Sequence, residues 1–264
     1  MSSPDPFLRD GPTALLGHTG FVGSNLAAQR EFTHRFNSRN IAEMAGRHFA
    51  LVACAAAPGV KWRANREPEA DRAAIDRLVA VLETVTADRV VLISTVDVYP
   101  LPRGVDEATE IAADGGHPYG RHRLALERFA RDRFDTLVVR LPGLFGPGLR
   151  KNVIYDLLTD HALDQINPAS TFQFYDLERL WADVAVAAAE GLPLVNFATE
   201  PVGVAAIAER AFGRSLPPRD GPAAHYDMRT RHAGCWGRSG PYLASQAEVL
   251  EGIARFVARE RGGG

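Results

Sequence analysis

Three glycines follow the first apolar run of the chain, in the segment Ala14-Leu-Leu-Gly17-His-Thr-Gly20-Phe-Val-Gly23. Their Gly-x-x-Gly-x-x-Gly spacing, followed by an apolar helical pattern, predicts a strand, a tight turn and the start of a helix. Glycine in such a turn permits the bend, lets a pyrophosphate approach the backbone, and allows the helix to pack closely on the strand. The free N–H groups of the first helical turn would then face the phosphates. Because a plain strand-to-helix turn fits the same spacing, the rest of the chain must decide.

The composition excludes several classes of protein. At 264 residues, the chain is long enough for one large domain, or for one domain and a small lobe. A net charge of -2 gives no strong attraction to nucleic acid or to an anionic membrane. No apolar run approaches the roughly 18 residues of a membrane span, and the first residues do not resemble a signal peptide. Cys54 and Cys235 lack metal-ligand spacing, so we expect a cytoplasmic protein without a metal site.

Apolar runs and helical patterns alternate along the first half of the chain. The expected strands are 13–16, 32–36, 49–55, 89–94 and 136–140, and the expected helical segments are 21–29, 41–45, 69–86 and 119–133. Residues 57–62 and 101–117 are expected to be loops. Such alternation predicts β-α-β units and an α/β fold, a doubly wound parallel sheet of the Rossmann type.

The pattern changes after Gly148. Helices are expected at 152–158, 177–190, 204–212 and 244–259, with a short strand at 194–197 and a loop at 217–240. We therefore expect a dinucleotide-binding domain at 12–148 and a small C-terminal substrate-binding lobe with returning elements at 149–264.

Ligands of an open parallel sheet bind beyond the carboxyl ends of its strands, so the residues that follow each strand are candidates for a site. Small residues follow the third strand, where a flat cofactor could lie close to the backbone. Hydroxyl groups follow the fourth. The residues expected to contact a dinucleotide are Gly17, Thr19, Gly20, Phe21, Val22, Gly23, Asn37, Ser38, Arg39, Ala55, Ala56, Ala57, Ser94, Leu141 and Pro142.

Tyr119 and Arg123 lie four residues apart in an expected helix and therefore share one face. A cation beside a phenol favours the phenolate and lowers the pKa of the tyrosine. Such a phenol can exchange a proton with an alcohol or a carbonyl oxygen, and the Thr95 hydroxyl could hydrogen-bond the same oxygen. This set of groups suits the movement of a hydride between a nicotinamide and a carbinol carbon. A lone Tyr-x-x-x-Arg pair also fits an ordinary surface helix; the glycine turn and the strand-end hydroxyl, in this order, favour the catalytic interpretation.

Residues 13–148 resemble the extended short-chain dehydrogenase/reductase superfamily, of the NAD-dependent epimerase/dehydratase type. The matching pieces are Gly17-x-x-Gly20-x-x-Gly23, Ser94-Thr95-x-x-Val98-Tyr99, Tyr119-x-x-x-Arg123 and Arg140-x-x-x-x-x-Gly146-Pro147-Gly148. By this resemblance Thr95 takes the position of the catalytic Ser/Thr and Tyr119 that of the catalytic acid/base. The resemblance also implies a nucleotide-linked sugar as substrate, and a homodimer is one assembly that it implies.

Arg123 departs from the family, which has lysine at this position. The family's lysine also holds the nicotinamide ribose hydroxyls, whereas arginine is longer, forked and hardly deprotonates. Three explanations are open: Arg123 substitutes with adjusted geometry, Lys61 reaches the site instead, or turnover has been lost. We favour the first, with Lys61 assisting or touching the substrate.

Residues in the expected loops indicate which cofactor is bound and where a substrate would lie. The end of the second strand offers Asn37-Ser38-Arg39 where an NAD site normally has Asp or Glu, which favours NADP over NAD. The expected substrate contacts are Lys61, Trp62, Asp97, Lys151 and Asn152. The leading hypothesis is an NAD(P)-dependent oxidoreductase acting on a keto or hydroxyl carbon of a nucleotide-sugar or a related substrate. The alternatives are an epimerase or dehydratase that retains NAD, and a non-catalytic NADP-binding sensor.

Overall fold

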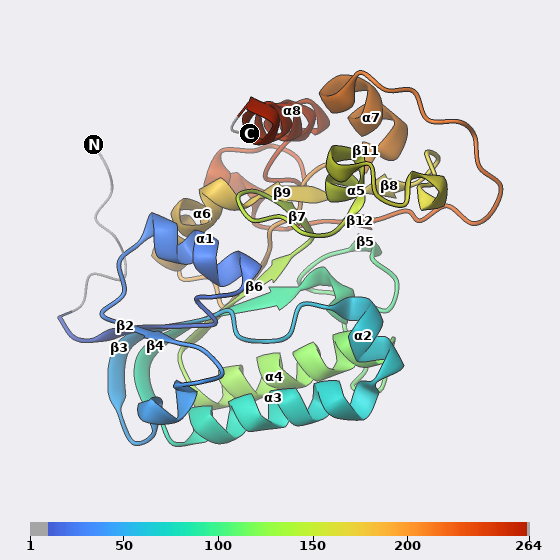
Figure 1. The fold of residues 1–264 in the computed structure, drawn as a ribbon. Coiled ribbons are helices and arrows are strands. Elements are labelled where there is room, and N and C mark those ends of the chain that lie inside the picture. The colour runs from blue at the N-terminus through green and yellow to red at the C-terminus, as the bar shows by residue number, and fades with distance from the viewer. Residues whose placement is uncertain (1–9, 263–264) are drawn as a thin grey trace. The chain divides into compact units, whose positions relative to one another are not determined.

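The computed structural model describes residues 10–262, which fall into two compact units (Figure 1). Within the described residues, the first unit comprises the chain up to Leu101, Ala108–Arg140 and Arg179–Val195. The second comprises Pro102–Glu107, Leu141–Glu178 and the chain from Asn196 onward. Each unit is therefore assembled from separate segments, and the single boundary expected after residue 148 stays a prediction.

A parallel six-stranded sheet forms the centre of the first unit, in the order β10-β6-β4-β3-β1-β2. Its strands are β1 (Thr13–Leu16), β2 (His34–Phe36), β3 (His48–Cys54), β4 (Thr86–Thr95), β6 (Thr136–Leu141) and β10 (Leu194–Asn196). This sheet confirms the α/β, Rossmann-like fold expected from the alternating pattern. The chain leaves β1 on one side to form β2 and returns to pair β3 on the other, which makes the carboxyl edge between β1 and β3 a point where the strand order reverses.

The register brings several strand ends to one level. Leu16 of β1 lies opposite both Phe36 of β2 and Cys54 of β3, and Cys54 lies opposite Leu92 of β4. The segments that follow these four positions therefore emerge at one edge of the sheet. They are the glycine turn, the 37–40 turn, the alanines after β3 and the hydroxyl residues at the end of β4.

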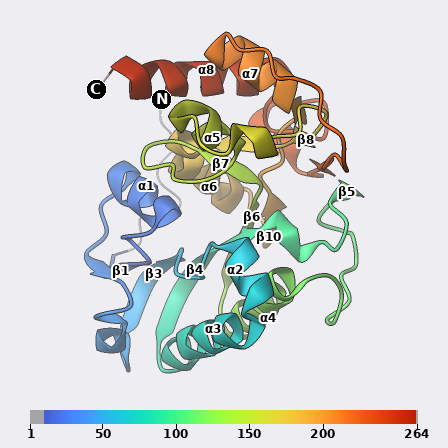
Figure 2. The ribbon, with the colours of Figure 1, turned by 45° about the vertical axis from the view of Figure 1, so that its right-hand side comes forward.

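Helices cover both faces of this sheet (Figures 1 and 2). The helices of the first unit are α1 (Phe21–Gln29), α2 (Lys61–Arg66), α3 (Pro68–Glu83), α4 (Pro118–Arg133) and α6 (Leu180–Ala189). Helices α3 and α4 lie side by side on one face, and α1 and α6 lie on the other (Figure 1). Buried side chains such as Val52 of β3, Leu78 of α3 and Leu126 of α4 form the core between the sheet and the α3–α4 layer. Because these strands are covered on both faces, they are apolar without alternation.

Among the described residues, the second unit is built from short strand pairs and three α-helices. Its elements are β5 (Arg103–Val105), β7 (Gly143–Phe145), α5 (Val153–Thr159), β8 (Thr171–Phe172), β9 (Phe174–Asp176), β11 (Val202–Gly203), α7 (Val204–Phe212), β12 (Asp227–Met228) and α8 (Gln246–Gly262). Strands β12 and β5 pair in parallel, as do β7 and β9, whereas β11 and β8 are antiparallel. Helices α7 and α8 pack against each other (Figure 2).

Several sequence-based boundaries need correction. The residues expected as a loop at 57–62 include the start of α2, which begins at Lys61. The helix expected to reach residue 86 ends at Glu83, because Thr84, Val85 and Thr86 favour extended structure and β4 begins at Thr86. The expected 101–117 loop contains β5, and the expected 217–240 loop contains β12. Within residues 10–262, no helix is long and apolar enough to cross a membrane.

Candidate functional site

The glycine turn after β1 leaves no room for a side chain at Gly17 or Gly23. Gly17 has a φ of +82°, and a Cβ placed on it would lie 2.4 Å from the Ala55 carbonyl oxygen. A Cβ on Gly23 would lie 2.1 Å from the Gly17 carbonyl oxygen. These two positions require glycine for the turn itself and for the packing of α1 on β1.

Gly20 is different, because the protein leaves room beside it. It is exposed, and a Cβ there would meet only the Gly17 carbonyl oxygen, at 3.3 Å. Gly20 is also the N-cap of α1, and among the described residues no side chain caps this helix end. The amide groups of the first turn of α1 are thus available to an anion, with a small residue beside them. The turn fits the pyrophosphate of a dinucleotide, and Thr19, Phe21 and Val22 belong to the same segment.

The turn after β2 presents no carboxylate from the expected positions. The Asn37 side-chain oxygen accepts a hydrogen bond from the Arg39 amide at 2.9 Å, and the Asn37 amide donates to the Asn40 side chain at 2.8 Å. Ser38 and Arg39 are exposed. The turn is therefore fixed by its own asparagines, and the Ser38 hydroxyl and Arg39 guanidinium lie at its surface.

The residues after β3 are small and half-buried. The Ala55 amide donates to the Leu16 carbonyl at 2.9 Å, which ties this segment to the end of β1. Ala56 and Ala57 follow in the same direction. Burial raises the pKa of the neighbouring Cys54 thiol to about 11, so Cys54 behaves as a core residue. Ala55 and Ala56 thus lie beside Gly17, and the contact of the three alanines with a dinucleotide stays a prediction.

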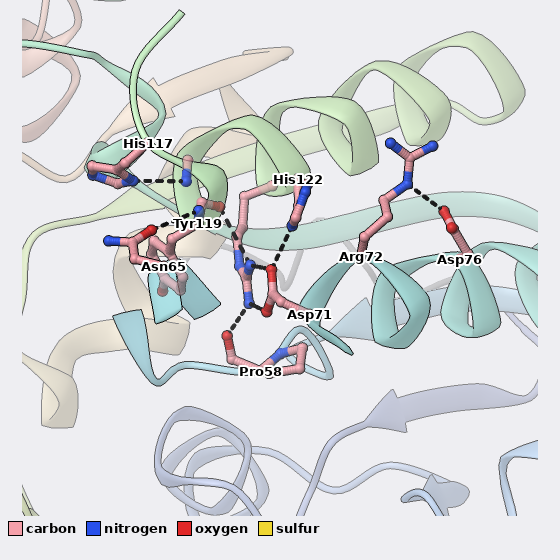
Figure 3. Close-up of polar contacts among 10 residues, drawn as sticks. Pro58, Asn65, Asp71, Arg72, Asp76, His117, Tyr119 and His122 are labelled. Atoms are coloured by element: carbon pink, nitrogen blue, oxygen red, sulfur yellow. Dashed lines mark hydrogen bonds and ion pairs between the residues drawn. The ribbon is translucent and has the colours of Figure 1, made fainter. Parts of the chain in front are cut away.

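Tyr119 lies in the first turn of α4, where three neighbours with no role predicted from the sequence fix its position: Gly120, Asn65 and His117. A Cβ on Gly120 would lie 2.1 Å from the Asp97 carbonyl oxygen, so only glycine lets α4 approach the segment after β4 this closely. The Asn65 side-chain oxygen accepts a hydrogen bond from the Tyr119 amide at 3.0 Å (Figure 3). His117 caps α4 by accepting from the Gly120 amide at 3.2 Å. The spacing of Pro118 and Gly120 around Tyr119 was the available signal for this tight contact.

The electrostatic environment of Tyr119 corrects the pKa direction expected from the sequence. Burial raises the pKa of the Tyr119 hydroxyl above its ordinary value, and this effect outweighs the Arg123 charge, which lowers it. Asp97 adds to the increase, while a hydrogen bond with Thr95 and the charge of Lys61 oppose it. The Tyr119 side chain is buried with 9% exposed, and loss of hydration penalises the phenolate. The free protein therefore favours the protonated phenol, and the expected hydrogen bond from Thr95 to the reacting substrate oxygen stays a prediction.

Arg123 is held by acceptors from three segments and is only 2% exposed. Its NH1 and NH2 atoms both donate to the Asp71 carboxylate, NH2 also donates to the Pro58 carbonyl, and NH1 donates to the Tyr119 carbonyl. The Arg123 Cζ atom lies 4.0 Å from the centroid of the Tyr119 ring. The Arg123 guanidinium therefore faces the Tyr119 ring. Within residues 10–262, its buried Nε has no hydrogen-bond partner.

Lys61 and Asp97 form a second charged pair near Tyr119. The Lys61 Nζ lies 2.6 Å from the Asp97 Oδ1, and the two side chains are 37% and 18% exposed. Both charges influence the pKa of Tyr119 and also that of His117, which burial lowers. The pairing of Lys61 with Asp97 was not predicted from the sequence, and their expected contacts with a substrate stay a prediction. Their neighbour Trp62 is 66% exposed.

Ser94 belongs to a buried network one helical turn beyond Arg123, built around Glu127 of α4. Its hydroxyl donates to the Glu127 carboxylate at 2.5 Å, and Glu127 in turn accepts from the Arg140 Nε and NH2 atoms. The Arg140 NH1 donates to the Tyr99 hydroxyl at 2.7 Å. The Ser94 hydroxyl is therefore used within the core.

The remaining expected site residues fall in the second unit, where each is described by itself. Leu141 ends β6, and Pro142 follows it. The Asn152 side chain caps α5 by accepting from the Ile154 amide, and it donates to the Leu144 carbonyl. Asn152 has a φ of +102°, an uncommon value for a residue other than glycine. Lys151 is exposed beside it. Asn152 thus has a local structural role that the sequence did not indicate.

Comparison with protein families decides the assignment. Residues 31–175, more than half of the chain, match the profile of the NAD dependent epimerase/dehydratase family. The chain belongs to this family. It is accordingly an enzyme of the NAD-dependent short-chain dehydrogenase/reductase type. The match includes Thr95, Tyr119 and Arg123 and begins after the glycine turn, which the geometry above describes independently.

Solved structures share the fold of this epimerase/dehydratase family member at low sequence identity. MoeE5 in complex with UDP-glucuronic acid and NAD is 21% identical with a TM-score of 0.72, covering 96% of this chain and 100% of that one. TunA, an NAD-dependent NDP-hexosamine 5,6-dehydratase, is 19% identical with a TM-score of 0.72, covering 96% and 98%. The UDP-N-acetylglucosamine 4-epimerase from Methanobrevibacter ruminantium M1 is 14% identical with a TM-score of 0.72, covering 97% and 100%. A search of curated protein sequences found no match.

Proposed function

We propose that this family member binds a nicotinamide dinucleotide at the glycine turn and interconverts a hydroxyl and a keto group on a nucleotide-linked sugar or a related substrate. The observation that carries the proposal is the close approach of Gly120, next to Tyr119, to the Asp97 carbonyl, which brings the start of α4 against the segment after Thr95, at the carboxyl edge of the sheet that also holds the glycine turn. UDP-sugars and NAD are bound by MoeE5, a structural neighbour. When bound, the dinucleotide supplies the acceptor or donor of a hydride.

Tyr119 provides the proton transfer that must accompany hydride transfer. In the oxidising direction, the ionised Tyr119 oxygen takes the proton of the substrate hydroxyl; in the reducing direction, the phenol returns a proton to the carbonyl oxygen. The Thr95 hydroxyl hydrogen-bonds the same reacting oxygen and fixes its position. Because burial raises the pKa of Tyr119, the phenol is protonated at neutral pH and is ready to donate.

The two expected cations are proposed to have different parts. Arg123 acts on Tyr119 from the face of its ring, in the geometry that replaces the family's lysine. Lys61, paired with Asp97 at 2.6 Å, assists at the substrate end together with Trp62. If Lys61→Arg has full turnover and unchanged substrate KM, the assisting role fails. Lys151 and Asn152 stay predicted substrate contacts, and the cytoplasmic location and the homodimer stay predictions.

NADP is the proposed preferred form of the cofactor, because the turn after β2 offers the exposed Ser38 hydroxyl and Arg39 guanidinium to a 2′-phosphate. Arg39→Ala should weaken NADPH binding by roughly tenfold, the worth of one charge-assisted hydrogen bond, and leave NADH binding nearly unchanged. Isothermal titration with each dinucleotide tests this. Equal losses for both would contradict the preference for NADP.

The same hydride transfer serves two kinds of reaction: a net reduction that consumes NAD(P)H, and an epimerisation or dehydration in which the enzyme keeps its NAD. Membership of the epimerase/dehydratase family favours the second kind. An epimerase or dehydratase retains its NAD and returns the hydride within each turnover, so no cofactor is consumed. The purified protein should first be examined for bound dinucleotide by absorbance near 340 nm after reduction. It is then assayed with a panel of nucleotide-sugars, monitoring both NAD(P)H and the sugar products.

Stoichiometric loss of NAD(P)H supports a reductase, whereas sugar conversion at constant cofactor supports an epimerase or dehydratase. Tyr119→Phe should slow either reaction by roughly 10²–10⁴-fold while dinucleotide binding persists. Binding without turnover of any tested sugar, unaltered by Tyr119→Phe, contradicts both forms of the proposal.

A further inference from the structure

The guanidinium of Arg123 is fixed more completely than a catalytic cation requires. Asp71 of α3 accepts from both terminal nitrogens, one of them at 2.8 Å, in the bidentate geometry typical of strong arginine–carboxylate pairs. The Pro58 and Tyr119 carbonyls accept from the same two nitrogens. Figure 3 shows Asp71 and Pro58 gathered at one point below α4. Both terminal nitrogens of Arg123 are therefore occupied before any ligand arrives.

Asp71 carries its charge at this position. Burial by itself raises the pKa of the Asp71 carboxyl, but hydrogen bonds from Arg123 and His122 hold it below its usual value. The His122 Nδ1 lies 2.7 Å from the Asp71 Oδ2, on the opposite side from the tyrosine (Figure 3). An ionised carboxylate directly against the Arg123 guanidinium largely cancels the field of that cation at a distance.

Tyr119 lies next to the Arg123–Asp71 pair, whose opposite charges largely cancel. The Arg123 Cζ is 4.0 Å from the centre of the Tyr119 ring, and the Tyr119 amide is held separately by Asn65. The other charged or titratable groups that influence it are Asp97 and Lys61, which pair with each other. His117 is the N-cap of α4, and its ring is tilted relative to that of Tyr119, with the ring centroids 6.3 Å apart. The position and net charge of the Arg123–Asp71 pair therefore decide how far the cation on α4 favours a phenolate.

We propose that Asp71 is a positioning residue for the Tyr119 acid/base, which fixes the Arg123 guanidinium against the ring face and neutralises it so that the phenol keeps its proton in the free enzyme. This inference rests on the proposed function, because it assigns Asp71 a part in the proton transfer of Tyr119. A carboxylate that merely stabilised the packing of α3 on α4 would leave the titration of Tyr119 unaltered when its charge is removed.

The test is a titration of Tyr119 that needs neither cofactor nor substrate. The full chain is labelled with 3-fluorotyrosine, which brings the titration of all six tyrosines to lower pH, and is followed by fluorine NMR. The resonance lost in Tyr119→Phe identifies Tyr119. Burial lowers the pKa of His117, so His117 carries no charge in the alkaline range where tyrosine titrates and contributes little to the differences among variants.

Three variants are expected to shift the pKa of Tyr119 in different directions. Asp71→Asn leaves the Arg123 charge uncompensated but still held by two carbonyls, so the pKa of Tyr119 should fall by about one unit. Arg123→Gln leaves the Asp71 charge and should raise the pKa of Tyr119 by a similar amount. The double variant removes both charges and should return the pKa of Tyr119 close to that of the unmodified chain. The control Asp76→Asn, which breaks an exposed pair with Arg72 on the same helix at 2.8 Å, should leave it unaltered (Figure 3).

An unaltered or raised pKa of Tyr119 in Asp71→Asn overturns the proposal. If Asp71→Asn does not fold because it leaves a buried charge unpaired, the other two variants decide. A double variant that shifts the pKa of Tyr119 as far as Arg123→Gln alone also overturns it. These outcomes are independent of turnover, so the inference can fail while Tyr119→Phe still shows the enzymatic proposal to be right, and the reverse also holds.

Discussion

Helix α4 takes part in two buried arginine–carboxylate pairs, and each places a guanidinium against a tyrosine ring. At one, Arg140 pairs with Glu127, and its Cζ lies 4.9 Å from the centre of the Tyr99 ring. At the other, Arg123 pairs with Asp71 and faces Tyr119. In the Arg140 pair, the arginine also binds the tyrosine hydroxyl: the Tyr99 hydroxyl accepts from the Arg140 NH1 at 2.7 Å. In the Arg123 pair, the Tyr119 hydroxyl is not bound by the arginine but interacts with Thr95, and the Arg123 Nε has no hydrogen-bond partner within residues 10–262.

The difference teaches how one set of side chains serves either packing or chemistry. A tyrosine whose hydroxyl is bound by the arginine is part of a satisfied network, and such networks rigidify a core. A tyrosine approached only at its ring face keeps a hydroxyl for a ligand. We therefore expect the Arg140–Glu127 pair with Tyr99 to contribute to stability, and the Arg123–Asp71 pair with Tyr119 to contribute to turnover.

The largest expected effect separates the two tyrosines by activity. Tyr119→Phe removes the group that exchanges the substrate proton, and turnover should fall by roughly 10²–10⁴-fold. Tyr99→Phe is the matched control: it leaves the Arg140 NH1 unpaired and should lower the free energy of unfolding by about 1–3 kcal/mol while turnover persists. Steady-state kinetics and urea unfolding of both variants check this. Comparable losses of turnover in the two would erase the distinction.

The next effect concerns the stability of the satisfied network. Glu127→Ala removes the carboxylate that accepts from Arg140 and Ser94, so a buried charge is left unpaired. The free energy of unfolding should fall by about 3–5 kcal/mol. The exposed pair of Arg72 and Asp76 gives the comparison, because Asp76→Ala should cost less than about 1 kcal/mol. Denaturant midpoints of both variants are the measurement, and a Glu127→Ala protein as stable as Asp76→Ala would show that the network contributes little.

The same contrast between packing and ligand recurs within the glycine turn. Gly23→Ala forces a methyl group to 2.1 Å from the Gly17 carbonyl oxygen and should destabilise the fold by about 1–3 kcal/mol. Gly20→Ala meets only one atom, at 3.3 Å, so it should fold normally and lose dinucleotide affinity instead. Thermal unfolding and dinucleotide titration of the pair sharpen the comparison. Equal stability losses would mean that Gly20 serves packing as well.

The smallest effect is a pH dependence that only the Tyr119 site should show. Because burial raises the pKa of Tyr119, the phenolate is a minor form below that pKa. The oxidising direction needs the phenolate, so its rate should rise about tenfold per pH unit in this range, while the reducing direction stays nearly flat. Rates in both directions across neutral to alkaline pH measure this slope. A flat oxidising profile would indicate that another group accepts the proton.

Local signals predicted the sheet and the glycine turn well. The bounds of β1 and α1 agree with the expected 13–16 and 21–29, because the apolar run and the three glycines are short-range features. The order of Thr95, Tyr119 and Arg123 after successive strands was enough to place them in one unit. The direction of the Tyr119 pKa was wrong, because burial of its hydroxyl depends on how closely Gly120 lets α4 approach the sheet.

The partners of Arg123 could not be predicted, because the pair with Asp71 joins residues 52 positions apart. One signal was present: Asp71 shares a helix face with Ile75, Leu78 and Leu82, all buried. A carboxylate in an apolar stripe needs a cation, but only the packing of α3 against α4 shows which one.

The scarcity of lysine turns the pair of Lys61 and Asp97 into a reporter. Lys61 and Lys151 are the only lysines in the sequence, and the Lys61 side chain is 37% exposed. An acylating reagent therefore has one lysine target beside Tyr119, and its other lysine target, Lys151, is itself a predicted substrate contact. The extent of acylation at each lysine, read by peptide mass spectrometry with and without a ligand, reports separately on occupancy beside Tyr119 and at Lys151, without any assay of turnover.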